Sequence, residues 1–156
     1  MSETQECCPR FDPTPWEERI LEWKNKRFVK ARVRSFLRIP LNFGTVLART
    51  QKKIQTAGAE TDDPVILSDE NSLWGSDLYV PVSQTLPKAK MVELSGTFLA
   101  QVYSGPYRNI PLWVKDLNYR VLARGKRIRK IYFYYTTCPV CAKKYGKNYV
   151  VLFAEI

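Results

Sequence analysis

Apolar and polar residues alternate between Phe28 and Pro40, and this stretch, FVKARVRSFLRIP, limits the fold more than any other. A period of two predicts a β-strand, because successive side chains of an extended chain point to opposite faces. A helical pattern follows, with Phe43, Val46 and Ile54 on one stripe, and Gly58 is predicted to end that helix as a left-handed cap. Two further strands are predicted, starting at Val65 and at Ser76.

The second half of the chain repeats this order. Residues Lys90–Tyr103 alternate, a helical stripe runs from Ile110 to Val121, and Gly125 is predicted to end the second helix. RIRKIYFYY and KNYVVLFAEI supply the last two strands. The sequence therefore predicts an α+β fold class with duplicated strand–helix–strand–strand units, an antiparallel sheet and both helices on one face.

The expected domain organisation follows from these two strand–helix–strand–strand units. Residues 1–27 are predicted to form an N-terminal arm with a short helix after Pro15, because Trp16, Ile20 and Trp23 recur at helical spacing. Residues 28–156 are predicted to form one domain, with halves at about 28–83 and 90–156.

The alternation also predicts which strand residues face the helices. The positions expected under the helices are purely apolar: Leu78, Val80, Val82, Val92, Leu94, Phe98, Val150, Leu152 and Ile156. The opposite face carries rings and acids instead: Asp77, Tyr79, Glu93, Gln101, Tyr103, Tyr132, Tyr134, Phe153 and Glu155. A solvated face would be mainly polar, so we predict a concave, aromatic-walled ligand groove there. The alternative is that Phe11, Trp16 and Trp23 of the N-terminal segment cover this face.

A resemblance supports the groove. SGPYRNIPLW before the second helix and IYFYY after it resemble motifs of the gyrase-inhibitor-like (GyrI-like) domain, the effector-binding fold of multidrug-responsive transcription activators. The similarity extends over about Phe28 to Ile156, and it implies a protein that binds hydrophobic or cationic amphipathic small molecules. The residues expected to contact the ligand are aromatic: Tyr79, Tyr103, Tyr107, Tyr132, Tyr134, Phe153, Trp74 and Trp113.

The resemblance also implies an alternative function, because some members of that family are similar to hydrolases that use a groove Glu and a Tyr. The matching position here is Lys130, so Glu93 or Glu155 with Tyr132 are the catalytic candidates for a hydrolase of reactive hydrophobic compounds. A carboxylate in an apolar groove can deliver a proton or activate water. The sequence contains no His, which excludes a Ser/His/Asp triad and a Cys–His dyad within this chain.

The four cysteines leave several interpretations open. Cys138 and Cys141 form a CPVC turn between two predicted strands, and Cys7 and Cys8 precede Pro9. Four thiolates could hold a structural zinc ion, which would make the chain a zinc-stabilised interaction module, a second alternative function. A hairpin loop with inert thiols explains the same residues. A redox dithiol would require the pair at a helix start, and the strand context argues against it.

Charge and composition limit the partners and the compartment. The net charge is +10, from 25 Lys+Arg against 15 Asp+Glu, but the charges are spread along the chain and are densest at Arg124–Lys130. We therefore expect a solvated basic surface and no nucleic-acid partner. The N-terminus has no apolar signal region, and no run approaches the roughly 20 apolar residues of a membrane helix. A cytoplasmic protein without a membrane partner is expected; the sequence does not fix the oligomeric state.

Overall fold

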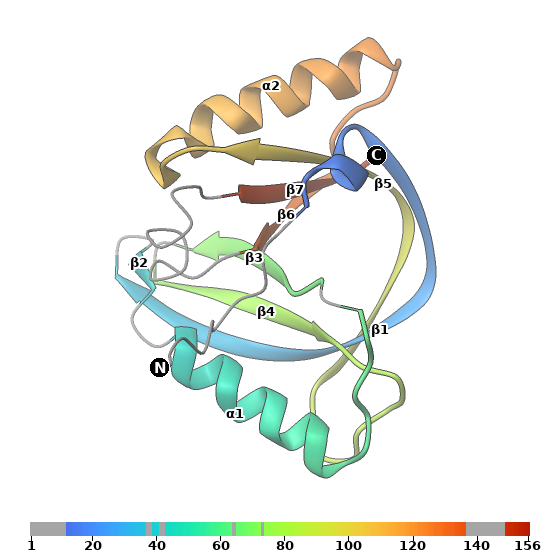
Figure 1. Ribbon diagram of the computed structural model, residues 1–156, viewed down its shortest axis with the longest axis vertical. Helices are drawn as coiled ribbons and strands as arrows, with labels where there is room; N and C mark the ends of the chain where they lie inside the picture. The colour runs from blue at the N-terminus through green and yellow to red at the C-terminus, as the bar shows by residue number, and fades with distance from the viewer. Residues whose placement is uncertain (1–11, 37–38, 41–42, 64, 73, 137–148) are drawn as a thin grey trace. The chain divides into compact units, whose positions relative to one another are not determined.

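The computed structural model of the chain describes residues 12–36, 39–40, 43–63, 65–72, 74–136 and 149–156. Over these residues there are seven β-strands and two α-helices (Figure 1). The strands are β1 (Arg19–Phe36), β2 (Ile39–Pro40), β3 (Leu67–Ser72), β4 (Gly75–Pro81), β5 (Met91–Ser104), β6 (Lys130–Tyr135) and β7 (Tyr149–Glu155). The helices are α1 (Phe43–Thr56) and α2 (Ile110–Ala123), with short 3₁₀ helices η1 (Thr14–Trp16) and η2 (Tyr107–Asn109).

The protein is mostly β, and the predicted α+β fold class is wrong. Long antiparallel strands dominate the described chain: β1 has 18 residues and β5 has 14. β1 begins at Arg19, inside the segment for which a short helix is predicted, and only η1 precedes it. The helical spacing of Trp16, Ile20 and Trp23 is a coincidence, because Trp16 ends η1 whereas Ile20, which is 43% exposed, and Trp23 belong to β1.

The chain forms two compact units. The first unit, Glu22–Gly96, is called the central unit because it lies in the middle of the sequence. The second, the terminal unit, combines Met1–Leu21 with Thr97–Ile156. In the central unit, β1 pairs antiparallel with β2 and with β4, and β4 pairs antiparallel with β3. In the terminal unit, β7 lies between β5 and β6 and is antiparallel to both.

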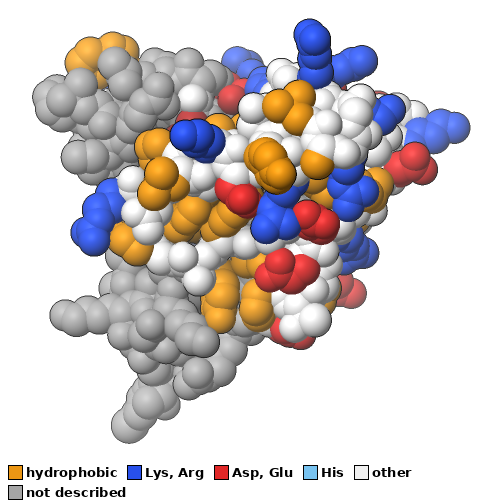
Figure 2. All heavy atoms as spheres, turned by 90° about the horizontal axis from the view of Figure 1, so that it is seen from above, with side chains coloured by type: hydrophobic (Ala, Val, Ile, Leu, Met, Phe, Trp, Pro, Cys, Tyr) orange, Lys and Arg blue, Asp and Glu red, His pale blue; other side chains and the backbone are white. Residues whose placement is uncertain are grey.

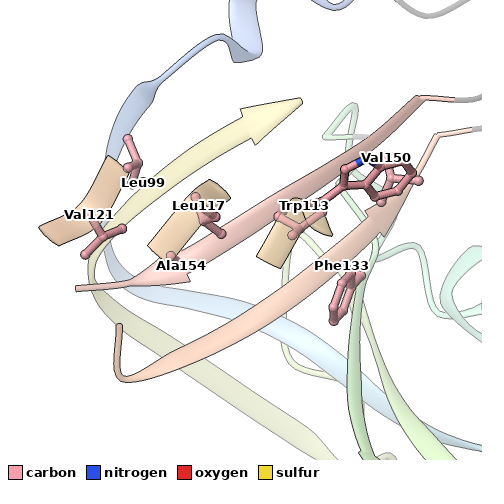
Figure 3. Close-up of a cluster of buried hydrophobic side chains, with 8 residues drawn as sticks. Leu99, Trp113, Leu117, Val121, Phe133, Val150 and Ala154 are labelled. Atoms are coloured by element: carbon pink, nitrogen blue, oxygen red, sulfur yellow. The ribbon is translucent and has the colours of Figure 1, made fainter. Parts of the chain in front are cut away.

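Each unit packs one helix against one face of its strands. In the terminal unit, Trp113, Leu117 and Val121 of α2 point toward the strands, and the cluster is completed by Leu99, Phe133, Val150, Leu152 and Ala154 (Figure 3). In the central unit, Val46 and Ile54 of α1 pack with strand residues that include Val29, Val33, Leu78 and Val80. Full burial of each large aliphatic side chain contributes about 1.5–3 kcal/mol, so these clusters fix both helices.

Both helices end at the predicted glycines. Gly58 and Gly125 have φ values of 68° and 73°, a left-handed conformation that favours glycine because it has no Cβ. The N–H groups after these turns bond back to the helices, Ala59 to the Ile54 carbonyl at 3.0 Å and Lys126 to the Val121 carbonyl at 3.2 Å. The two helix ends are thus confirmed, with the hydrogen bonds expected of such caps.

The prediction of which β5 residues face the helices is wrong. Leu99 and Tyr103 pack into the cluster under α2, whereas Phe98 lies on the opposite face with its ring 6.4 Å from that of Tyr132. Likewise Met91, rather than Val92 or Leu94, packs against the cluster that contains Ile54 of α1. Residues 98–102 of β5 are buried on both faces, and a strand buried on both sides shows no alternation from which its inward face can be chosen.

Candidate functional site

The aromatic face of the terminal unit is closed by the chain's own N-terminal segment. Tyr132, Tyr134 and Phe153 are only 3%, 8% and 0% exposed. The Trp16 ring lies edge-on to Tyr134 and Phe153, with centroid distances of 6.2 and 5.5 Å. The predicted open ligand groove is therefore wrong, because Trp16 occupies the side of these rings that the groove requires. Of the residues in the alternative prediction, Trp16 covers this face, Trp23 lies beside Phe28 in the central unit, and Phe11 lies outside the described residues.

The other predicted ligand residues do not gather around one site. Tyr103 stacks on Trp113, at 5.7 Å and an interplanar angle of 13°, on the side of the sheet that α2 covers. Tyr79 belongs to the central unit, where its ring lies 6.2 Å from that of Phe28. Trp74 is 58% exposed, and the side chain of Tyr107 lies outside the described part of the chain.

Two of the three predicted catalytic residues share a face of the terminal unit. Glu155 is the antiparallel partner of Lys130, two pairs along the strands from Tyr132, whose partner is Phe153. Lys130, at the position where the GyrI-like pattern has Glu, places its Nζ 5.3 Å from the centre of the Tyr132 ring. Glu93 lies in the central unit and is exposed. The catalytic roles of these residues stay predictions.

The four cysteines, Cys7, Cys8, Cys138 and Cys141, lie outside the described residues. Within the described ranges, no group of three or more His, Cys, Asp or Glu side chains could hold a metal ion. Among the same residues, neither helix is long and apolar enough to cross a lipid bilayer.

The terminal unit carries a charged network between its N-terminal segment and α2. Asp116 accepts hydrogen bonds from the Tyr103 hydroxyl and from Arg120 Nε, both at 2.7 Å. Glu18 accepts from Arg120 at 2.5 Å and from Arg124 at 3.5 Å. A surface depression of about 390 Å³ lies over these residues, with Tyr119 and Ala123 on its wall. Figure 2, which views the molecule from the α2 side, shows acidic and basic side chains interleaved on this face.

The ionisation of this network argues against proton transfer by Asp116 and Tyr103. The hydrogen bond from Arg120, with a second from Tyr103, lowers the pKa of Asp116 below its usual range. Burial, together with the bond to Asp116, raises the pKa of the Tyr103 hydroxyl, so the phenol keeps its proton at neutral pH. An acid that stays ionised at neutral pH and a phenol that stays protonated there are poor general acids and bases, whose pKa should lie near the working pH. The network therefore fastens the N-terminal segment to α2.

A second charged cluster lies in the central unit, on the sheet face opposite α1. Directly opposite residues of neighbouring strands share a face, and the pairs here are Lys30 with Tyr79, Arg32 with Asp77, and Asp77 with Asp69. We call Lys30, Arg32, Asp77 and Asp69 the charged row. It runs across three strands, β1, β4 and β3, in that order.

The carboxylates of the charged row are buried and its cations are not. Asp69 and Asp77 are 6% and 8% exposed as residues. Asp77 Oδ2 lies 3.7 Å from Lys30 Nζ, and Asp77 Oδ1 lies 3.4 Å from an Arg32 nitrogen, Nη1. The Lys30 and Arg32 side chains keep 34% and 49% of their surface exposed. Like charges directly opposite in a sheet are destabilising, so the two cations offset an arrangement that packing alone does not explain.

The charged row brings together groups that hydrolysis requires. A carboxylate can take a proton from water and return it to a leaving group, and a cation such as Lys30 or Arg32 can stabilise negative charge that develops on a substrate oxygen. Tyr79, two residues after Asp77 on the same face of β4, adds a hydroxyl group and is 6% exposed. No comparable pair of carboxylates on neighbouring strands occurs among the described residues of the terminal unit.

The sequence prediction placed Asp77 and Tyr79 on the face of the sheet opposite the helices but did not single out Asp69, Lys30 and Arg32. A signal was present in the short strands, since β3 (LSDENS) and β4 (GSDLYVP) each contain an Asp, a residue that is depleted in strands. Asp, Lys and Arg are almost never buried unless they are paired. What the sequence did not supply was the register that sets Asp69 opposite Asp77.

Two solved structures share the fold. A hydrolase from Listeria innocua aligns with a TM-score of 0.60 at 14% sequence identity, covering 90% of this chain and 91% of that one. An uncharacterized conserved protein from Listeria innocua aligns with a TM-score of 0.62 at 12% identity, covering 89% and 91% of the two chains. No curated protein matches the sequence.

A family model described as "Bacterial hydrolase" matches residues 1–156, the full length of the sequence. The resemblance to the GyrI-like family is therefore wrong, and so is the small-molecule-binding function that it implied. The motifs that carried the resemblance, a Gly-Pro-Tyr turn and an aromatic strand, are short. Of the predicted functions, the hydrolase alternative agrees with the match: the chain belongs to the bacterial hydrolase family.

Proposed function

We propose that the protein is a hydrolase whose catalytic centre is the charged row of the central unit. The observation that carries the proposal is the pair of buried carboxylates, Asp69 and Asp77, directly opposite each other on β3 and β4. The family match supports the reaction class. The carboxylate and tyrosine of the hydrolase alternative are then Asp77 and Tyr79, in place of Glu93 or Glu155 with Tyr132.

In the proposed reaction, one carboxylate of the pair accepts a proton from a water molecule as the water oxygen attacks the electrophilic centre of the substrate. The new bond joins that oxygen to the substrate, and the bond to the leaving group breaks. The proton passes from the carboxyl group to the leaving group, so the enzyme returns to its starting state. Lys30 stabilises the negative charge that forms on the substrate oxygen.

The test is the turnover of chromogenic nitrophenyl esters and phosphoesters by purified protein and variants. Asp77→Asn and Asp69→Asn remove the ability to take a proton while keeping the size of the side chain. Each should lower kcat by about 10²–10⁴-fold, the usual contribution of a positioned acid or base. Thermal unfolding of each variant shows whether the lost activity reflects lost chemistry or a lost fold.

Matched controls are the acids that the sequence suggested. Glu155→Gln and Glu93→Gln make the same chemical change on other strands and should leave kcat within about twofold, because these residues lie outside the charged row. Turnover that survives in both Asp variants, or that disappears in Glu155→Gln instead, contradicts the proposal.

A further inference from the structure

The β1 edge of the charged row is cationic. Lys30, Arg32 and Arg34 alternate along β1 on one face, directly opposite Tyr79, Asp77 and Gly75 of β4. Among the residues whose pairing is given, three cations on this face are set against two carboxylates, Asp77 and Asp69. A positive excess beside a hydrolytic centre favours the encounter with an anionic substrate and disfavours a cationic one.

Gly75 gives Arg32 its position. A Cβ atom added at Gly75 would lie 2.6 Å from Arg32 Nη2 and 2.8 Å from both Cζ and Nε, closer than real contacts allow. The guanidinium therefore lies across the β4 backbone at the one position of that strand that has no side chain. All three close contacts are with the guanidinium group, so even alanine at position 75 would have to displace it.

Arg32 is held on one side and accessible on the other. Asp77 Oδ1 accepts from its Nη1 at 3.4 Å, and the Asp77 side chain is only 11% exposed. The Arg32 side chain is 49% exposed even though its guanidinium rests on the backbone at Gly75. A planar guanidinium with five N–H donors suits two oxygens of one carboxylate or phosphate group, and a fixed guanidinium loses little entropy on binding them.

We infer that Arg32, flanked by Lys30 and Arg34, binds the anionic group of the substrate, a carboxylate or a phosphate, and that Gly75 is the positioning residue for this subsite. The inference rests on the proposed hydrolase function, since it assigns a substrate class to the same face. It goes beyond that function because it concerns recognition: Arg32 selects the substrate, and the carboxylates act on it.

The first experiment measures binding without turnover. Isothermal titration with benzoate and, separately, with inorganic phosphate should show saturable binding to the wild-type protein. Arg32→Gln and Gly75→Ala should each weaken binding about 10-fold or more, as expected for the loss of a charge-assisted pair of hydrogen bonds. Lys115→Gln removes an exposed cation from α2 and should leave the affinity unchanged. Benzoate and phosphate distinguish the two anion classes. If neither anion binds to the wild-type protein, the inference is wrong.

The second experiment separates recognition from chemistry with a matched substrate pair, a nitrophenyl ester of a dicarboxylic acid and the neutral methyl ester of the same compound. Arg32→Gln should raise KM for the anionic substrate by about 10-fold or more with little change for the neutral one. Gly75→Ala should reproduce this split, whereas a merely structural defect would affect both substrates equally. An equal effect on the two substrates, or no change in KM, overturns the inference.

The two proposals fail separately. If Asp77→Asn and Asp69→Asn keep full turnover, the catalytic proposal fails, yet titration with benzoate and phosphate still decides whether Arg32 binds anions. If Gly75→Ala does not fold, as circular dichroism would show, Arg32→Gln carries the test alone, because it changes a half-exposed side chain. An affinity for both anions that is the same in Arg32→Gln and in the wild type rejects the subsite.

Discussion

The two units have the same local architecture but differ in the sheet face that the helix leaves uncovered. In each, a helix covers one face of antiparallel strands, and the difference lies in the face that the helix leaves. In the terminal unit that face is aromatic and is covered by Trp16. In the central unit it carries two buried carboxylates and half-exposed cations. The aromatic face contributes stability through burial, whereas the charged face incurs electrostatic costs that stability alone does not require.

This contrast teaches where to look for chemistry in such a fold. The aromatic residues of the strands led us to predict a binding surface from the sequence. In the structure these rings pack against one another and against the indole of Trp16, so they form part of a core. Buried like charges on neighbouring strands are the more informative observation, because a sheet gains nothing from them unless they act on something. The comparison predicts that substitutions in the aromatic face mainly change stability, and that substitutions in the charged row mainly change activity.

The largest expected effect on stability is from Phe153→Ala. Phe153 is fully buried and contacts Trp16, so its removal leaves a cavity and should lower the free energy of unfolding by about 3–5 kcal/mol. Urea unfolding followed by circular dichroism measures it. Arg32→Gln, on the charged face, should cost less than about 1 kcal/mol because the Arg32 side chain is half exposed and Lys30 still lies near Asp77. A loss for Arg32→Gln as large as that for Phe153→Ala would break the comparison.

Trp16→Ala tests whether the N-terminal segment seals the aromatic face. Its indole makes two edge-on ring contacts, each worth about 0.5–1.5 kcal/mol beyond the area that it buries, so a loss of about 1–3 kcal/mol is expected. The matched control is Trp74→Ala, since Trp74 is 58% exposed and should change stability by no more than about 0.5 kcal/mol. Equal effects of the two Trp variants would mean that Trp16 does not cover the rings.

Local sequence signals predicted the elements better than their arrangement. The glycine caps at Gly58 and Gly125 follow from chemistry within one turn, and the structure has them. Apart from the two-residue strand β2, which lies between β1 and α1, the order strand, helix, strand, strand occurs twice, as β1–α1–β3–β4 and β5–α2–β6–β7. The fold class was wrong because Arg19–Lys26 continues β1, and tertiary pairing overrode the helical spacing of Trp16, Ile20 and Trp23.

The charged row could not be predicted from the sequence for a different reason. Which acids of neighbouring strands oppose each other depends on register, and a shift of one residue sends a side chain to the other face. β3 contains a register irregularity between Asp69 and Ser72, so counting residues from its end would misplace Asp69. The aromatic groove was predicted because tyrosine alternation was visible, whereas the cover provided by Trp16 depends on a contact between residues more than 100 positions apart in the sequence.

The smallest expected effect concerns the network that fastens the N-terminal segment to α2. Since Arg120 and Tyr103 lower the pKa of Asp116 in the folded protein, the ionised form stabilises the fold. This contribution is complete well above the ordinary Asp pKa of 3.8 and is lost as the pH falls through the lowered folded value. Asp116→Asn should therefore cost less than about 1 kcal/mol at pH 7, because Asp116 and Arg120 are 42% and 35% exposed.

The difference between wild type and Asp116→Asn in urea unfolding should shrink from pH 5 to pH 3, and it should also shrink in 1 M NaCl at pH 7 because salt screens exposed pairs. Turnover at pH 7 should be unchanged, since Asp116 is not part of the charged row. A variant whose destabilisation grows on acidification would contradict the sign of the pKa shift. Lost turnover without lost stability would place chemistry in the terminal unit and reverse the roles assigned to the two faces.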